Sequence, residues 1–248
     1  MSDSLAVLIE LSLVFLLAGF VKGAIGMGLP TVAIGFLALL MPPAEAATIL
    51  ILPSFVTNVW QLAVGPRLGG LVRRLWPLLV AAAVATVAAG RWIGAVSSPA
   101  TLAGLGAALV LYGIIGLAPL RLEVPAQHEF WLGPLIGAAS GVVTALTGAF
   151  VIPAAPYLQS LPFEPDELVQ ALGLSFTVST VALAVALADA GEFAWPNGSA
   201  SVLALATAIG GMLVGQAVRE RLRPKTFRLW FLAGLMLLGA HLMLSSFL

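Results

Sequence analysis

Residues 19–30 read Gly-Phe-Val-Lys-Gly-Ala-Ile-Gly-Met-Gly-Leu-Pro, and they close an apolar run that begins at Leu5. Glycine loses more conformational freedom in a helix than any other residue, whereas proline suits the first turn of a helix. The stretch therefore predicts that a long helix breaks at its glycines and that a short second piece opens at Leu29. Lys22 lies beside this break, at the end of the apolar run.

The rest of the chain is built from similar apolar runs. Of its 248 residues, 60% are hydrophobic and only 9% are charged, whereas soluble domains are about 25% charged. A run of about 20 apolar residues crosses a hydrocarbon layer of about 30 Å as a helix. The apolar segments cover residues 5–21, 29–40, 46–64, 75–94, 101–118, 130–146, 150–161, 168–188, 201–218 and 227–248. The sequence predicts an all-α, polytopic transmembrane helix bundle.

Charge and motif content argue against several classes of function. The chain has 11 basic and 11 acidic residues and no cysteine, so it offers neither the basic surface that binds nucleic acid nor a thiolate metal site. It contains no zinc motif, P-loop, GxSxG elbow or acidic ion cage. We therefore expect no enzyme activity, no metal and no cofactor.

The two halves of the chain resemble each other in the order of their motifs. The break at residues 23–30 has a counterpart at residues 141–148, which precedes a second short piece beginning at Phe150. The other matches pair residues 19–23 with 137–141, 43–45 with 165–167, 76–77 with 195–196, Gly90 with Gly215, and 99–102 with 224–227. Each match is weak alone, but their common order predicts two repeats, residues 1–120 and 130–248, joined by a cytoplasmic linker at 121–129.

Basic residues, which favour short cytoplasmic loops, set the expected orientation. Apart from Lys22 and Arg91, they occur at residues 67–74, at Arg121 and at residues 219–228. The connections around Pro99 and residues 189–196 contain none, although Arg91 lies near the first of them. Equivalent connections of the two halves thus differ in charge: where one half has a basic connection, the other half has a connection without Lys or Arg. That pattern predicts inverted-topology repeats of four to five helices, a plan that recurs in secondary transporters. Both termini are expected outside, and the choice between eight and ten membrane segments stays open.

Lys22 and the two breaks are the main candidates for a binding site. An ionisable side chain at membrane depth is costly and is by default functional, although Lys22 could instead extend to the membrane surface. Its counterpart in the second half is Ser140. Unwound backbone is tolerated in a membrane only inside protein or along a wet cavity, so we expect the two breaks to meet near the centre. A helix that begins after a break, as expected at residues 29–31 and 150–153, offers free N–H groups to an anion.

Polar residues also collect on one equivalent segment in each half. Ser54, Thr57, Asn58 and Gln61 are spaced so that they share one helical face. The corresponding segment carries Ser175, Thr177, Ser179 and Thr180. These residues could line a polar path, or they could form hydrogen bonds between helices.

The glycine breaks, the Pro-x-Glu openings and the duplicated halves resemble the TauE/SafE family of membrane permeases, over nearly the whole chain. The resemblance is most specific at residues 19–30. Residues 144–148 depart from the family's repeated glycines, which suggests hydroxyl contacts from Thr144 and Thr147. The resemblance implies a bacterial inner-membrane transporter of small sulfur-containing anions such as sulfite, sulfoacetate or thiosulfate. Our hypothesis is a secondary transporter that exports sulfite or an organosulfonate by alternating access, and the choice between export and import stays open.

The expected partners are a small anionic substrate and the lipid bilayer, with no nucleic acid, and a homodimer is left open. The alternatives are a permease for another small anion, a channel, or a membrane sensor or scaffold. Glu10 leaves proton coupling open. The predicted substrate-binding residues are Lys22, Gly23, Gly26, Gly28, Thr31, Asn58, Gln61, Ser140, Thr144, Thr147, Gly148, Ser175, Thr177 and Ser179.

Overall fold

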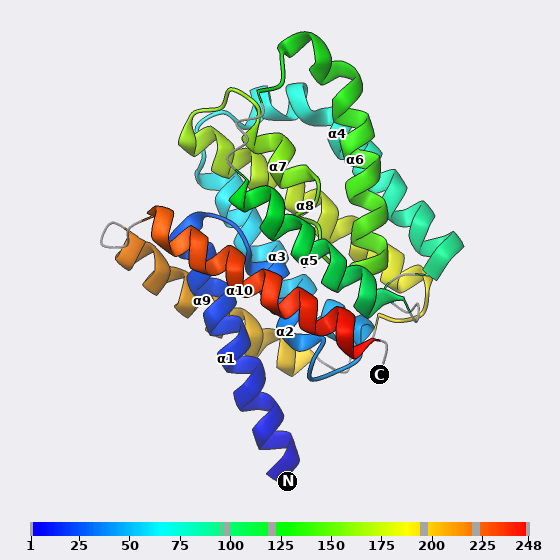
Figure 1. Cartoon of the computed structure of the whole chain (residues 1–248), viewed down its shortest axis with the longest axis vertical. Coiled ribbons are helices and arrows are strands. Elements are labelled where there is room, and N and C mark those ends of the chain that lie inside the picture. Colours follow the sequence, from blue (N-terminus) through cyan, green and yellow to red (C-terminus); the bar gives the residue numbers. More distant parts are fainter. Residues whose placement is uncertain are drawn as a thin grey trace.

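The computed structural model describes residues 2–94, 96, 100–118, 123–193, 198–219 and 224–246. Within these ranges every regular element is helical (Figure 1). The elements are α1 Ser2–Ile25, α2 Leu29–Leu37, α3 Pro43–Val64, α4 Leu68–Ala89, the π-helical η1 Gly90–Gly94, α5 Thr101–Leu117, α6 Ala126–Thr147, α7 Ala154–Gln159, α8 Pro165–Asp189, α9 Gly198–Arg219 and α10 Pro224–Ser245. The predictions about Pro99, Arg121, Trp195, Pro196, Arg221 and Arg223 lie outside the described residues.

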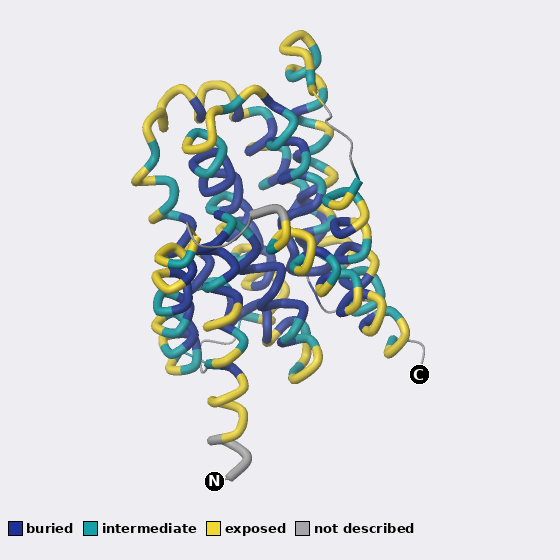
Figure 2. Tube along the Cα trace, turned by 60° about the vertical axis from the view of Figure 1, so that its left-hand side comes forward, coloured by how far each residue is buried: buried dark blue, intermediate teal, exposed yellow. Residues whose placement is uncertain are grey.

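The helices form a membrane-embedded bundle, as the sequence predicted. Seven of the described helices are long and apolar enough to cross a membrane, and α5 is a shorter apolar helix. Large apolar side chains such as Leu13, Trp92 and Leu237 are more than half exposed on the outer surface, which suits a hydrocarbon solvent rather than water. Buried residues occupy the interior of the bundle, as Figure 2 shows. The chain is therefore a multi-pass membrane protein.

Glycine pairs join the first helix of each half to the fourth helix of the other half. Gly19 and Gly23 place α1 against the backbone of α9, and Gly137 and Gly141 place α6 against α4. A Cβ on Gly19 would lie only 2.1 Å from the carbonyl oxygen of Ala208. Small residues allow this close approach. Because no hydrophobic effect drives helices together in lipid, the close van der Waals packing stabilises these helix pairs instead. The two helix pairs are equivalent under exchange of the halves.

The equivalent helices α3 and α8 cross in opposite directions. Thr48, near the start of α3, donates a hydrogen bond to the carbonyl of Glu192, which follows α8 (3.3 Å). Gln170, near the start of α8, donates to the carbonyl of Leu62, near the end of α3 (2.8 Å). The antiparallel course of these helices agrees with inverted repeats. α6 begins at Ala126, inside the predicted linker, and the predicted repeat boundaries at 120 and 130 stay a prediction.

The first break lies where the sequence predicted it. α1 ends at Ile25, and α2 begins at Leu29. Gly26 and Gly28 have φ values of +81° and +103°, a conformation that other residues rarely adopt. The three residues between the helices therefore turn the chain back on itself, so that α1 and α2 form a hairpin in contact (Figure 1).

The second break lies further along the chain than the sequence predicted. α6 continues without interruption to Thr147, and the short helix α7 begins at Ala154 rather than at Phe150. The hydroxyls of Thr144 and Thr147 donate to carbonyls one turn earlier in α6, an arrangement that is compatible with a continuous helix. Gly148, with φ +71°, ends α6 instead.

The expectation that the two breaks meet is also corrected. Gly26 adjoins the side chain of Val169 near the start of α8, whereas Gly148 adjoins Ile34 of α2 and Ala47 near the start of α3. The second break thus packs against the middle of α2 rather than against the first break at its start. Each break sits against the beginning of one central helix, α3 or α8.

Candidate functional site

Lys22 lies near the end of α1 and is only 2% exposed. Its ammonium donates one hydrogen bond to the hydroxyl of Thr57 (3.1 Å) and another to the side-chain oxygen of Asn58. Both acceptors belong to the polar face of α3 that the sequence predicted, and both are buried. The structure therefore brings together the charged residue of the first half and its polar stripe.

Among the residues that the structure describes, the hydrogen-bond partners of this ammonium are neutral. The salt bridges between described residues join Arg67 to Glu167, Arg74 to Glu129 and Arg91 to Asp189. None of them includes Lys22, and Thr57 and Asn58 account for two of its three N–H donors. A buried charge without a counter-ion is energetically unfavourable in a low-dielectric interior. A bound anion would offset this energetic cost.

Several buried polar atoms of α3 and α2 lack a hydrogen-bond partner among the described residues. They are the hydroxyl of Ser54, the amide nitrogen of Asn58, the amide oxygen of Gln61 and the hydroxyl of Thr31. Buried polar groups are nearly always hydrogen-bonded, so such a group points to a ligand or water. The Ser54 and Asn58 groups can donate to an anion. The Gln61 oxygen is an acceptor and would need a donor such as water.

The first break is attached to α3 by Gln61. Its amide nitrogen donates to the carbonyl of Gly26 (2.7 Å), so unwound backbone and polar stripe form one connected group. Thr31 is fully buried in the first turn of α2. Gly23 has a different environment, because a Cβ there would lie 2.1 Å from the carbonyl of Met212 in α9. Gly23 therefore serves helix packing in this structure.

The predicted residues of the second half are not hydrogen-bonded to this group in the described part of the chain. Ser140 donates to the carbonyl four residues before it (2.8 Å), as Thr144 and Thr147 do. Thr177 donates to Gly173 in the same way (2.7 Å). Ser175 and Ser179 are buried on α8, and Gly148 lies in the second break. A role for these residues in ligand binding stays a prediction.

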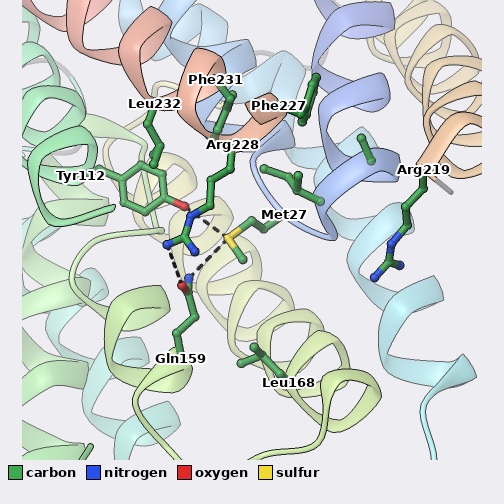
Figure 3. Close-up of a pocket in the computed structure, with 11 residues that line it drawn as sticks. Met27, Tyr112, Gln159, Leu168, Arg219, Phe227, Arg228, Phe231 and Leu232 are labelled. Carbon is green, nitrogen blue, oxygen red and sulfur yellow. Dashed lines mark hydrogen bonds between the residues drawn. The ribbon is translucent and has the colours of Figure 1, made fainter. Parts of the chain in front are cut away.

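Sequence reasoning missed a cavity of about 300 Å³ on the other side of the first break. It is lined by Ala24, Ile25, Met27, Tyr112, Gln159, Leu168, Arg219, Phe227, Arg228, Phe231 and Leu232. Figure 3 shows Tyr112, Gln159 and Arg228 around the sulfur of Met27. Tyr112 and Gln159 are polar residues within apolar runs, and that signal could have identified them. Arg219 and Arg228 were predicted only as part of a basic cytoplasmic connection.

Comparison with known proteins places this chain in a recognised family. The family described as Sulfite exporter TauE/SafE matches residues 11–242. No curated protein and no solved structure gives a match. The matched range covers nearly the whole chain and includes Lys22, both breaks and both central helices. The chain therefore belongs to the TauE/SafE sulfite exporter family, membrane transporters of sulfite- and sulfonate-type anions.

Proposed function

We propose that this protein is a secondary transporter that exports sulfite or a small organosulfonate by alternating access, with the anion bound at Lys22. The observation that carries the proposal is a buried ammonium whose hydrogen-bond partners among the described residues are the neutral side chains of Thr57 and Asn58. Charge-assisted hydrogen bonds from an ammonium to an oxyanion are among the strong ones. The unpaired donors of Ser54 and Asn58 supply further hydrogen bonds from α3.

The arrangement of the two halves supports alternating access. The central helices α3 and α8 run antiparallel, and each half contributes one helix to each glycine-packed pair, α1 with α9 and α6 with α4. In transporters built from inverted repeats, one half rocks against the other around a fixed site. Lys22 and Asn58 belong to α1 and α3 of the first half, and these helices pack against α9 and α8 of the second half. A movement between the halves would therefore change the surroundings of this site.

The proposed setting is a bacterial inner membrane, with the basic ends of the helices in the cytoplasm and both termini outside. An inside-negative potential favours exit of an anion by about 2.3 kcal/mol per charge per 100 mV. Export of a dianion can therefore proceed without a coupled ion. This orientation rests on the distribution of Lys and Arg and on the family resemblance.

The test is uptake of labelled anions into proteoliposomes that contain the purified protein. The panel is sulfite, thiosulfate, sulfoacetate, sulfate and a small carboxylate, each under an imposed potential. We expect saturable flux of a sulfur oxyanion, and we expect Lys22→Gln to lower that flux by about a hundredfold, because charge-assisted hydrogen bonds are lost. Wild-type protein that is folded and carries no member of the panel would contradict the proposal.

A further inference from the structure

The cavity beyond the first break contains hydrogen-bond donors that lack strong acceptors. Tyr112 of α5, which is 5% exposed, donates its hydroxyl proton to the sulfur of Met27 (3.2 Å). The amide nitrogen of Gln159 of α7 approaches the same sulfur at 3.6 Å. A thioether is a weak acceptor. Both donors would form stronger hydrogen bonds with an oxyanion.

Two arginines, Arg219 and Arg228, line the same cavity. Arg228 of α10 donates to the amide oxygen of Gln159 at 3.5 Å, a long hydrogen bond, and Arg219 lies on the far side of the cavity (Figure 3). Among the described residues that line the cavity, none is acidic. A guanidinium can bind two oxygens of one oxyanion through its planar fork of donors. The cavity is thus electropositive and rich in donors.

The size and position of the cavity suit a small hydrated anion. Its volume of about 300 Å³ equals about ten water molecules at about 30 Å³ each. The first break separates it from Lys22, because the carbonyl of Gly26 is bound by Gln61 of α3 while the side chain of Met27 faces the cavity. An anion in the cavity would therefore have only the first break between it and Lys22.

We propose that this cavity is a second anion site, in which Arg228, Gln159 and Tyr112 bind the oxyanion before it passes the break, with the side chain of Met27 displaced. This inference rests on the proposed function, since it names the approach to the Lys22 site. It assigns the cavity a small oxyanion of the sulfite class. The three donors come from α5, α7 and α10, so both halves contribute.

The experiment measures binding of radiolabelled sulfite to purified protein by equilibrium dialysis. The variants are Arg228→Gln, Tyr112→Phe, Lys22→Gln and the control Arg73→Gln. Arg73 is exposed on α4 and lines a different pocket, so its substitution removes one positive charge from the same end of the bundle. Gel filtration and thermal unfolding show whether each variant is folded.

We expect two bound anions per wild-type chain, two for Arg73→Gln and one for Arg228→Gln. Tyr112→Phe, which removes a single hydroxyl, should weaken the second site about tenfold, the loss expected for one hydrogen bond. Wild-type binding in both Arg228→Gln and Tyr112→Phe would overturn the second site. The proposed function fails separately, if Lys22→Gln keeps the wild-type stoichiometry.

Discussion

At the scale of residues, the candidate site is defined by a buried lysine that forms no ion pair with the residues that the structure describes. Lys22 is buried beside Thr57 and Asn58, and the Ser54 hydroxyl and the amide nitrogen of Asn58 lack a hydrogen-bond partner among the described residues. A lysine whose role was only structural would be expected beside a carboxylate, because that arrangement offsets the cost of burial. The charge and the unpaired donors are both explained by one anion.

Sequence reasoning could find part of this site but not all of it. Lys22 and Asn58 were predictable, because ionisable and amide side chains are rare within apolar runs and so stand out. Their contact was not, since nothing in the spacing of residues says that the end of α1 meets the second half of α3. The group around Arg228 is formed by helices from distant parts of the chain, and only the tertiary structure brings it together.

At the scale of elements, glycine positions decide which helices approach closely. On α9 two adjacent glycines have opposite environments. A Cβ on Gly211 would lie 2.1 Å from the carbonyl oxygen of Leu16 in α1, whereas nothing lies within 4 Å of a Cβ on Gly210. Substituting either glycine by alanine makes the same chemical change in the same helix. The two variants therefore differ only in the contact of the new methyl group with α1.

Gly211→Ala should destabilise the protein, because α1 must move away from α9 to admit the methyl group. Gly210→Ala should leave stability unchanged or raise it by about 1 kcal/mol, the gain in helix propensity. Thermal unfolding of the two variants in detergent measures the difference. Equal melting temperatures would mean that the close approach of α1 and α9 does not contribute to stability.

The two breaks show what glycine can and cannot reveal in a sequence. The first was predictable, since Gly26 and Gly28 adopt positive φ and Pro30 follows directly in α2. The second was misplaced because Gly141 has the same composition signal but serves packing against Ala82 of α4. A glycine at a helix contact and a glycine at a helix end look alike until the neighbouring helix is known.

At the scale of the whole molecule, the ion pairs lie at the two ends of the bundle. Arg91 of η1 pairs with Asp189 at the end of α8 (2.8 Å). The start of α1 and the end of α10 lie toward one end of the bundle in both views (Figures 1 and 2). Arg74 of α4 pairs with Glu129 of α6 at the other end (2.6 Å). The composition could predict a membrane bundle, and the two repeats predicted from the order of the motifs stay a prediction. The packing of α1 on α9 and of α6 on α4 required the structure.

The orientation of the bundle can be tested directly, because the chain has no cysteine of its own. Glu192 and Arg73 are exposed residues, one after α8 and one early in α4. In intact cells an impermeant maleimide should label the Glu192→Cys variant and leave the Arg73→Cys variant unlabelled until the membrane is opened. The reverse pattern would contradict the assignment of the basic end to the cytoplasm and the inverted topology inferred from it.

The central claim, that an unneutralised ammonium at Lys22 binds the transported anion, is tested most directly by sulfite flux through the Asn58→Asp variant. Aspartate has nearly the shape of asparagine, and its carboxylate would lie against the ammonium that Asn58 now binds. The account predicts a folded protein whose flux falls by about a hundredfold, since the net positive charge of the site is gone. Flux at the wild-type rate, in protein shown to be folded by thermal unfolding, would contradict it.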